Sequence, residues 1–163
     1  MDIFLMQHGA SISGEIDPQR PLSSLGAEQC ARSARAMRAM GLGFDALLCS
    51  PKLRALETAR IVAETLGFRR EAVRQTERLI PKARPDATLD LLAEYANEAT
   101  LLLIGHLPNL ADLASLLLSA GNKVALGFEN AGLTFLHADE CAPGKGILGW
   151  HLSPYHLQFI ARA

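Results

Sequence analysis

Short apolar runs alternate with longer segments of helical periodicity along this chain, and this alternation constrains the fold more than any other feature. The runs at 2–6 and 100–104 are almost wholly apolar, which is typical of strands buried on both faces of a sheet. Because helical segments separate most of the strands, we predict an α/β domain with a helix-flanked, largely parallel sheet. Further strands are predicted at 44–49, 73–76, 132–137 and 147–152.

Capping residues mark the helix boundaries. Ser23 or Ser24 is expected to cap a helix that runs to about residue 40. Ser50-Pro51 predicts the start of a second helix, with the serine as N-cap and the proline in the first helical position. This helix should stop at Gly67. Two more helices are predicted at 86–97 and from Pro108 to about Gly121, while the segment 159–162 favours no single state.

Length and charge exclude several kinds of protein. The 163 residues fit one domain, residues 1–163, with a single core. A net charge of −1 argues against nucleic acid or an anionic membrane as a bulk partner. The longest apolar stretch, at 110–121, is interrupted by Asp112 and is too short to span a bilayer, and the N-terminal run is too short for a signal peptide.

The three cysteines, Cys30, Cys49 and Cys141, are odd in number and lack the spacing of metal ligands. They are expected to be reduced thiols packed as small apolar side chains. Thiols of this kind indicate a reducing compartment. We therefore expect a soluble, cytoplasmic protein.

Three short segments place polar residues at one end of the predicted sheet. They are QHG at 7–9, SPKLRALETA at 50–59 and GHLP at 105–108. His8 and His106 each follow a buried strand, and ligands of open α/β sheets bind beyond the carboxyl ends of the strands. Together the three segments predict a phosphate pocket.

Each residue also has a purely structural interpretation. His8 is either a hydrogen-bonded structural residue or a nucleophile whose second ring nitrogen must be held by a carbonyl or carboxylate. Gly9 serves a turn or lets a ligand approach the backbone. Arg54 is a solvated helix residue or a bidentate ligand of a phosphoryl group at a helix N-terminus. His106 is a helix cap or a donor to phosphoryl oxygens.

The ordered set HG, SPxxRAxxTA and GHxP resembles the histidine phosphatase superfamily, also called phosphoglycerate mutase-like. The short chain, without room for a large helical insertion, and the segment RPLSSLG at 20–26 look most like the SixA-type phosphohistidine phosphatases. The resemblance implies that His8 is transiently phosphorylated, that Arg54 binds the phosphoryl oxygens, and that His106 is the second pocket histidine. It also implies that Asn130 lies near a phosphate-contacting position. It implies no metal and no cofactor.

One position departs from the family pattern. The motif Arg-His-Gly is replaced by Gln7-His8-Gly9, and glutamine donates only neutral hydrogen bonds. Loss of one pre-organised donor costs on the order of 100- to 1,000-fold in rate. Arg20 could restore the charge, the substrate could have an easy leaving group, or the pocket could bind phosphate groups without turnover.

Several functions fit these residues. The first is a phosphohistidine phosphatase that acts on a phosphorylated protein such as a histidine-containing phosphotransfer domain. Because imidazole leaves readily, this reaction needs no dedicated acid, and Glu77 is given no catalytic role. The alternatives are a phosphatase for small phosphorylated molecules and a catalytically impaired domain that binds phosphate or a phosphoprotein. A metal hydrolase is disfavoured, since no ligand cluster accompanies the two histidines.

Overall fold

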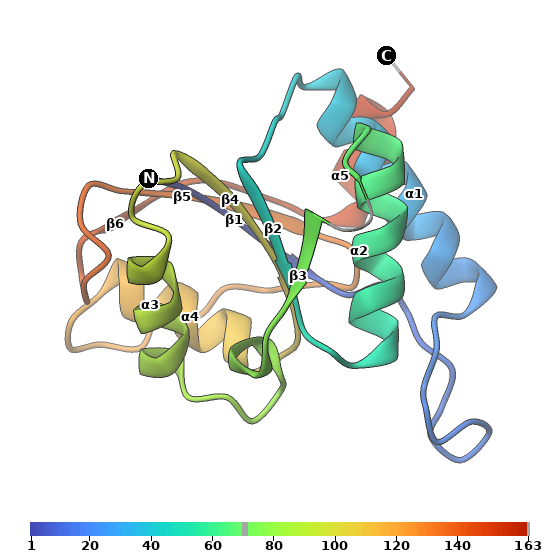
Figure 1. Ribbon diagram of the computed structural model, residues 1–163, viewed down its shortest axis with the longest axis horizontal. Helices are drawn as coiled ribbons and strands as arrows, with labels where there is room; N and C mark the ends of the chain where they lie inside the picture. Colours follow the sequence, from blue (N-terminus) through green and yellow to red (C-terminus); the bar gives the residue numbers. More distant parts are fainter. Residues whose placement is uncertain (70–71, 163) are drawn as a thin grey trace.

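Six strands form one sheet in the order β3-β2-β4-β1-β5-β6 (Figure 1). The computed structural model describes residues 1–69 and 72–162. β1, β4, β2 and β3 are paired in parallel, whereas β5 pairs antiparallel with both β1 and β6. The predicted α/β fold with a largely parallel sheet is confirmed, and the C-terminal strands make the sheet mixed. The strands are β1 Asp2–Gln7, β2 Ala46–Cys49, β3 Val73–Gln75, β4 Thr100–Gly105, β5 Leu133–Ala138 and β6 Gly146–Leu152.

Helices cover both faces of the sheet (Figure 1). α1 packs against α2 and α5 on one face, and α3 packs against α4 on the other. No helix in the described part of the chain combines the length and the apolar character needed to cross a membrane. The helices are α1 Ser24–Ala39, α2 Leu53–Leu66, α3 Pro85–Glu94, α4 Asn109–Leu118 and α5 Pro154–Ile160, with a short 3₁₀ turn, η2, at Glu77–Leu79.

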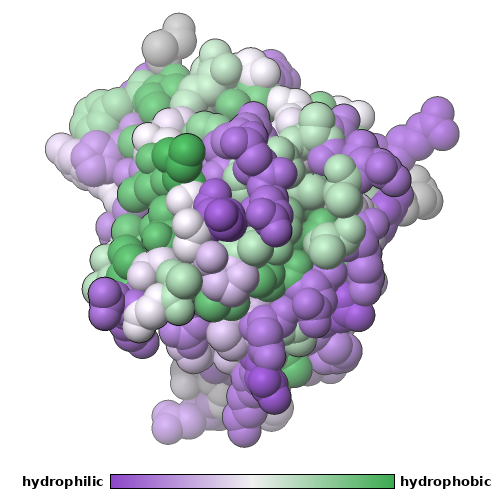
Figure 2. Space-filling model, turned by 90° about the vertical axis from the view of Figure 1, so that its left-hand side faces the viewer, coloured by the Kyte–Doolittle hydropathy of each residue, from purple (hydrophilic) through white to green (hydrophobic). Residues whose placement is uncertain are grey.

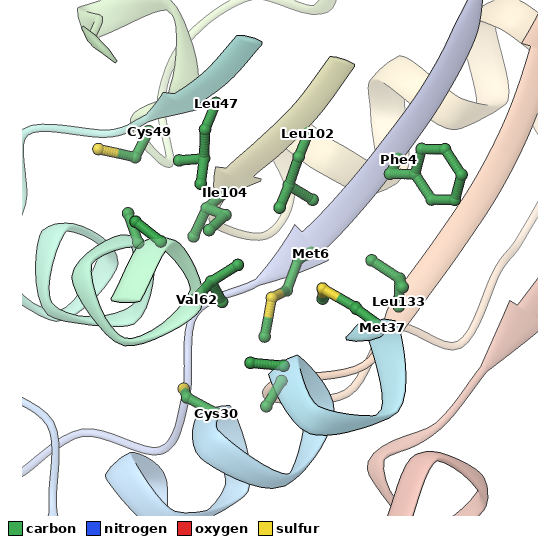
Figure 3. Packing of buried hydrophobic residues seen from close by; sticks show 14 of the residues in the cluster. Phe4, Met6, Cys30, Met37, Leu47, Cys49, Val62, Leu102, Ile104 and Leu133 are labelled. Carbon is green, nitrogen blue, oxygen red and sulfur yellow. The ribbon is translucent and has the colours of Figure 1, made fainter. Parts of the chain in front are cut away.

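The alternation of side chains along β1 divides the core into two layers. Phe4 and Met6 pack toward α1 and α2, and Ile3 and Leu5 pack toward α3 and α4. Figure 3 shows the first layer, where Met6 lies near Met37 of α1. Because both faces are buried, the strand has no polar face, and this explains its continuous apolar sequence.

The helix starts differ in part from the sequence prediction. α1 is capped as expected, since the Ser23 hydroxyl accepts a hydrogen bond from the Gly26 amide. The predicted start of α2 is wrong by two residues, because Lys52 has an extended backbone and stands at the N-cap. Pro108 caps α4 instead of occupying its first turn. α5 was not predicted as a helix; Pro154 occupies its first turn.

Candidate active site

The register of the parallel strands places the two histidines side by side. Gln7 of β1 is paired with Gly105 of β4, so the next residues, His8 and His106, leave the sheet at the same edge. Their ring centroids lie 4.8 Å apart. Both side chains are buried. The tertiary structure therefore brings together two residues that are far apart in sequence.

Arg54 completes the group from the neighbouring helix. It is the second residue of α2, and its side chain is buried despite its charge. Its Nε–H donates a hydrogen bond to Nε2 of His8 over 3.1 Å. The first turn of α2 follows β2, and β2 is paired with β4, so this guanidinium lies beyond the same edge of the sheet as the histidines.

The tautomer of His8 follows from its two hydrogen bonds. Nδ1 lies 2.7 Å from the carbonyl oxygen of Gly9, an atom that can only accept, so Nδ1 carries the hydrogen. Nε2 accepts from Arg54 and therefore presents its lone pair toward the guanidinium. The carbonyl that the sequence could not identify belongs to the next residue in the chain.

The electrostatic surroundings keep both imidazoles neutral. Burial, with smaller contributions from the charges of Arg54 and Arg20, lowers the pKa of His8 from 6.5 to about 4, although the hydrogen bond to the Gly9 carbonyl opposes this shift. The pKa of His106 is lowered to about 2, chiefly by burial and then by His8 and Arg54. A neutral imidazole has a free lone pair, which is the form required of a nucleophile.

Ser50 has a different function from the helix cap predicted for it. Its hydroxyl lies 2.9 Å from Nε2 of His106 and so holds the second imidazole. The other nitrogen of that ring, Nδ1, is buried and has no hydrogen-bond partner among the described residues. A buried polar atom without a partner is costly, which makes this nitrogen a candidate contact for a bound group.

Gly9 and Thr58 fix the loop that carries His8. The Gly9 amide donates to the Thr58 hydroxyl over 3.1 Å, and that hydroxyl donates to the carbonyl oxygen of Arg54 over 2.7 Å. A Cβ atom at Gly9 would lie 2.5 Å from the Cys30 sulfur, so only glycine fits. In the free protein Gly9 therefore positions His8 by close packing, and its contact with a ligand stays a prediction.

The side chain of Asn130 contacts the backbone of the loop that carries His8. Its Nδ2 donates to the carbonyl oxygen of His8 over 2.7 Å, and the Ala131 amide donates to the carbonyl oxygen of Gln7 over 2.9 Å. The side-chain Oε1 of Gln7 is buried without a partner among the described residues. Gln7 and Asn130 line the same hollow of about 340 Å³. Asn130 thus supports His8, while its contact with phosphate stays a prediction.

Arg20 lies in the loop before α1, outside the buried trio. Its side chain is exposed, and its guanidinium donates to the Ser11 hydroxyl over 3.4 Å. It lines a cleft of about 570 Å³ together with Arg54. Its charge lowers the pKa of His8, His106 and Arg54, so the guanidinium acts on the whole site.

Other candidates do not join the site. Glu77 is exposed in η2 and does not line this cleft. No group of three or more His, Cys, Asp or Glu side chains that could hold a metal ion is present in residues 1–69 and 72–162. Sequence reasoning missed the positioning contacts of Ser50 and Thr58, although both belong to the segment SPKLRALETA that it singled out.

Comparisons with known proteins agree with this geometry. Residues 3–80 match the model of the histidine phosphatase superfamily (branch 1). The chain is 27% identical over 165 residues to the phosphohistidine phosphatase SixA of Escherichia coli (strain K12). The aligned region covers 97% of each of the two chains. It is 30% identical over 144 residues to an uncharacterised protein of Picosynechococcus, covering 85% of this chain and 86% of that protein.

The solved structures include a protein histidine phosphatase SixA in complex with tungstate. It superposes with a TM-score of 0.85 at 26% identity, over 96% of this chain and 99% of that one. The fold, the site at the edge of the sheet and the full-length similarity agree with one another. The chain belongs to the histidine phosphatase superfamily and is a phosphatase.

Proposed function

We propose that the protein is a phosphohistidine phosphatase that acts on a phosphorylated protein through a phosphorylated His8. The observation that carries the proposal is the orientation of this imidazole. The carbonyl oxygen of Gly9 accepts a hydrogen bond from Nδ1–H of His8, and the lone pair of Nε2 faces the guanidinium of Arg54. A phosphoryl group held by that guanidinium would meet the nucleophilic nitrogen directly. The similar SixA structure holds tungstate, a tetrahedral oxyanion.

The first step transfers the phosphoryl group to the protein. Nε2 of His8 attacks phosphorus, the new N–P bond forms, and the P–N bond of the substrate breaks. The departing imidazole keeps the electron pair and takes a proton from solvent. Because imidazole is a good leaving group, no dedicated acid is required, which is consistent with the exposed position of Glu77.

The second step releases phosphate. Water attacks phosphorus on the phosphorylated His8, the P–Nε2 bond breaks, and the electron pair returns to Nε2. During both steps the Arg54 Nε–H turns from His8 to a phosphoryl oxygen, and His106 donates to another. Arg20 supplies part of the positive charge that Gln7 lacks, because it faces the same cleft as Arg54. Such donors stabilise charge on the equatorial oxygens.

The partner we propose is a histidine-containing phosphotransfer domain or a similar phosphorylated protein. The three cysteines are free thiols, and burial raises the pKa of each of them. Unreactive, unpaired thiols are typical of a reducing compartment, so we propose that residues 1–163 act as one domain in the cytoplasm.

The test is single-turnover dephosphorylation of a phosphohistidine protein by the wild type, His8→Ala and Gln7→Arg. We expect the wild type to release phosphate and His8→Ala to release none. Equal rates for the wild type and His8→Ala would refute the proposed nucleophile. Efficient turnover of one small phosphate ester in place of the protein would favour the small-molecule alternative. If the wild type binds the phosphoprotein without hydrolysing it, and Gln7→Arg restores hydrolysis, the protein is a binding domain.

A further inference from the structure

The cleft beside Arg54 is larger than a phosphoryl group requires. Its volume of about 570 Å³ lies in the range of pockets that hold small organic ligands. It opens between the loop before α1 and the start of α2, so it adjoins the reacting nitrogen through Arg54. We call this hollow the cationic cleft; its walls are Pro18, Gln19, Arg20, Pro51, Lys52, Leu53, Arg54, Leu56 and Pro81.

The charge of the cationic cleft is one-sided. Arg20, Lys52 and Arg54 line it, and no acidic residue does. None of the three forms an ion pair with a carboxylate in the described part of the chain. The nearby carboxylate of Glu57 is engaged elsewhere, because it accepts a hydrogen bond from the Leu22 amide over 2.6 Å. An anion in the cleft would therefore meet uncompensated positive charge.

The three cations are more than one phosphoryl group needs. Arg54 already contacts His8, and Arg20 compensates for Gln7, so Lys52 remains without a role in the proposed reaction. Lys52 is exposed at the N-cap of α2, and its ammonium forms no ion pair within the described residues. The remaining walls are largely proline and leucine, which suit the apolar parts of an extended peptide.

We infer that Lys52 and the cationic cleft bind an acidic side chain that flanks the phosphorylated residue of the protein substrate. The inference rests on the proposed function and refines its substrate class to phosphohistidine in an acidic sequence. Lys52 forms a solvent-exposed ion pair with the carboxylate, which selects the substrate without touching the reacting atoms. The pair is weakened by salt because it is exposed.

The test uses two phosphohistidine peptides that differ only in having glutamate or glutamine beside the phosphorylated residue. The variant is Lys52→Gln, and the control is Lys145→Gln, which removes an exposed charge outside the cleft. We expect Lys52→Gln to lower kcat/KM for the glutamate peptide by about two- to fivefold, as for one exposed ion pair, and to leave the glutamine peptide unchanged. Lys145→Gln should change neither.

A binding measurement separates this inference from the proposed function. Both peptides are also made with a hydrolysis-resistant phosphonate analogue of phosphohistidine, and their Kd values are measured by fluorescence anisotropy. If the wild type binds the glutamate peptide more tightly than the glutamine peptide, and Lys52→Gln removes this difference, the result supports the proposed role of the cationic cleft. This holds even if no peptide is hydrolysed. Equal Kd values for the two peptides in the wild type, or equal losses for both in Lys52→Gln, would overturn it.

Discussion

Two hollows of similar size lie at opposite ends of the central sheet, and their charges are opposite. The cationic cleft of about 570 Å³ lies beyond the carboxyl ends of the parallel strands. The second hollow, of about 590 Å³, lies at their amino ends and is lined by Glu98, Asp139, Glu140 and the amino-terminal Met1. Figure 2 shows the left-hand side of Figure 1, where hydrophilic side chains lie among apolar ones. The net charge of −1 gives no indication of this separation of positive and negative charge.

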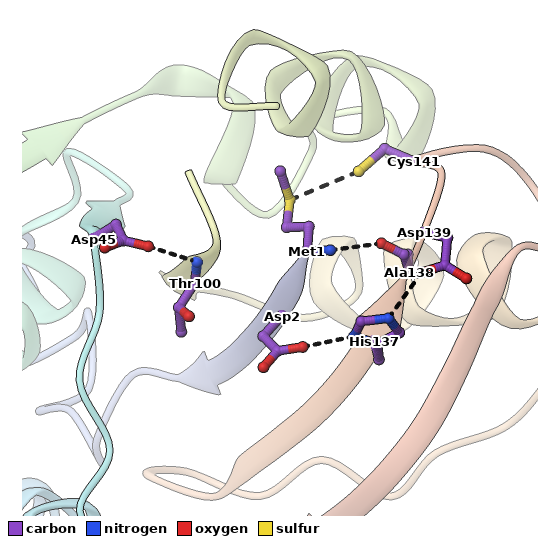
Figure 4. Close-up of polar contacts among 8 residues, drawn as sticks. All are labelled: Met1, Asp2, Asp45, Thr100, His137, Ala138, Asp139 and Cys141. Atoms are coloured by element: carbon purple, nitrogen blue, oxygen red, sulfur yellow. Dashed lines mark hydrogen bonds and ion pairs between the residues drawn. The ribbon is translucent and has the colours of Figure 1, made fainter. Parts of the chain in front are cut away.

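Histidines at the two ends respond to their surroundings in opposite directions. At the amino ends His137 contacts Asp2 over 2.6 Å and Asp139 over 3.2 Å, and these carboxylates raise its pKa (Figure 4). At the carboxyl ends burial lowers the pKa of His8 and His106. Protonation of histidine is thus favoured at the amino ends, at His137, and disfavoured at the carboxyl ends, at His8 and His106. Attraction for anions at the candidate active site therefore comes from Arg20, Lys52 and Arg54 and not from its neutral histidines.

The largest expected effect is the loss of the nucleophile. His8→Ala should lower single-turnover phosphate release at least about 1,000-fold, because the remaining donors cannot form the covalent intermediate. His137→Ala, the matched change at the opposite end, should leave the rate within about twofold. A comparable loss in His137→Ala would show that the two ends do not act separately.

Restoring the arginine of the family motif at position 7 is expected to have the next largest effect on the rate. Gln7→Arg should raise the rate about 10- to 100-fold, less than the full value of a pre-organised donor, because Arg20 already supplies part of the charge. Steady-state kinetics with Arg20→Ala and the double variant would measure the compensation. No gain in Gln7→Arg would mean that Arg20 replaces the missing arginine completely.

The close packing under His8 is tested by Gly9→Ala. The added Cβ would approach the Cys30 sulfur to 2.5 Å and the Gly26 carbonyl oxygen to 2.6 Å, so we expect a loss of about 1–3 kcal/mol in the free energy of unfolding. Gly121→Ala is the control, since its Cβ meets nothing within 4 Å. Urea unfolding measures both. Equal stability of the two variants would contradict the packing argument.

The smallest expected effect is the pH dependence of stability. The folded pKa of His106 lies below its ordinary value of 6.5, so the unfolded chain binds more protons between these values and stability falls as the pH is lowered. Between pH 6.5 and pH 5 this loss amounts to about 1–2 kcal/mol. Urea unfolding of His106→Gln should show a smaller loss than the wild type.

His137 gives the opposite sign. Its pKa is raised in the folded protein, so its contribution is complete below pH 6.5 and disappears as the pH rises through the raised pKa. His137→Gln should therefore lose more stability at pH 5 than at pH 8. The same urea series measures this, and a larger loss at pH 8 would contradict the assigned ion pairs.

Much of the fold was predictable because its signals are local. The apolar run at 2–6 and the serine cap before α1 depend only on neighbouring residues, and both predictions are confirmed. The start of α2 was predicted two residues too early, because Lys52 has an extended backbone and stands at the N-cap. The contact of Ser50 with a histidine 56 positions along the chain could not be predicted from neighbouring residues. α5 was missed since its seven residues are too few to show clear periodicity.

The sequence by itself determined which chemical groups this protein has and at which end of the sheet they emerge, because apolar runs end at His8 and His106. Only the tertiary structure decided how those groups are used. The tautomer of His8 depends on Gly9 and Arg54, and the one-sided charge of the cationic cleft depends on the loop before α1 and the start of α2, which meet in space. Hydrogen bonds and electrostatic fields act over distances in space, and spacing along a chain does not record them.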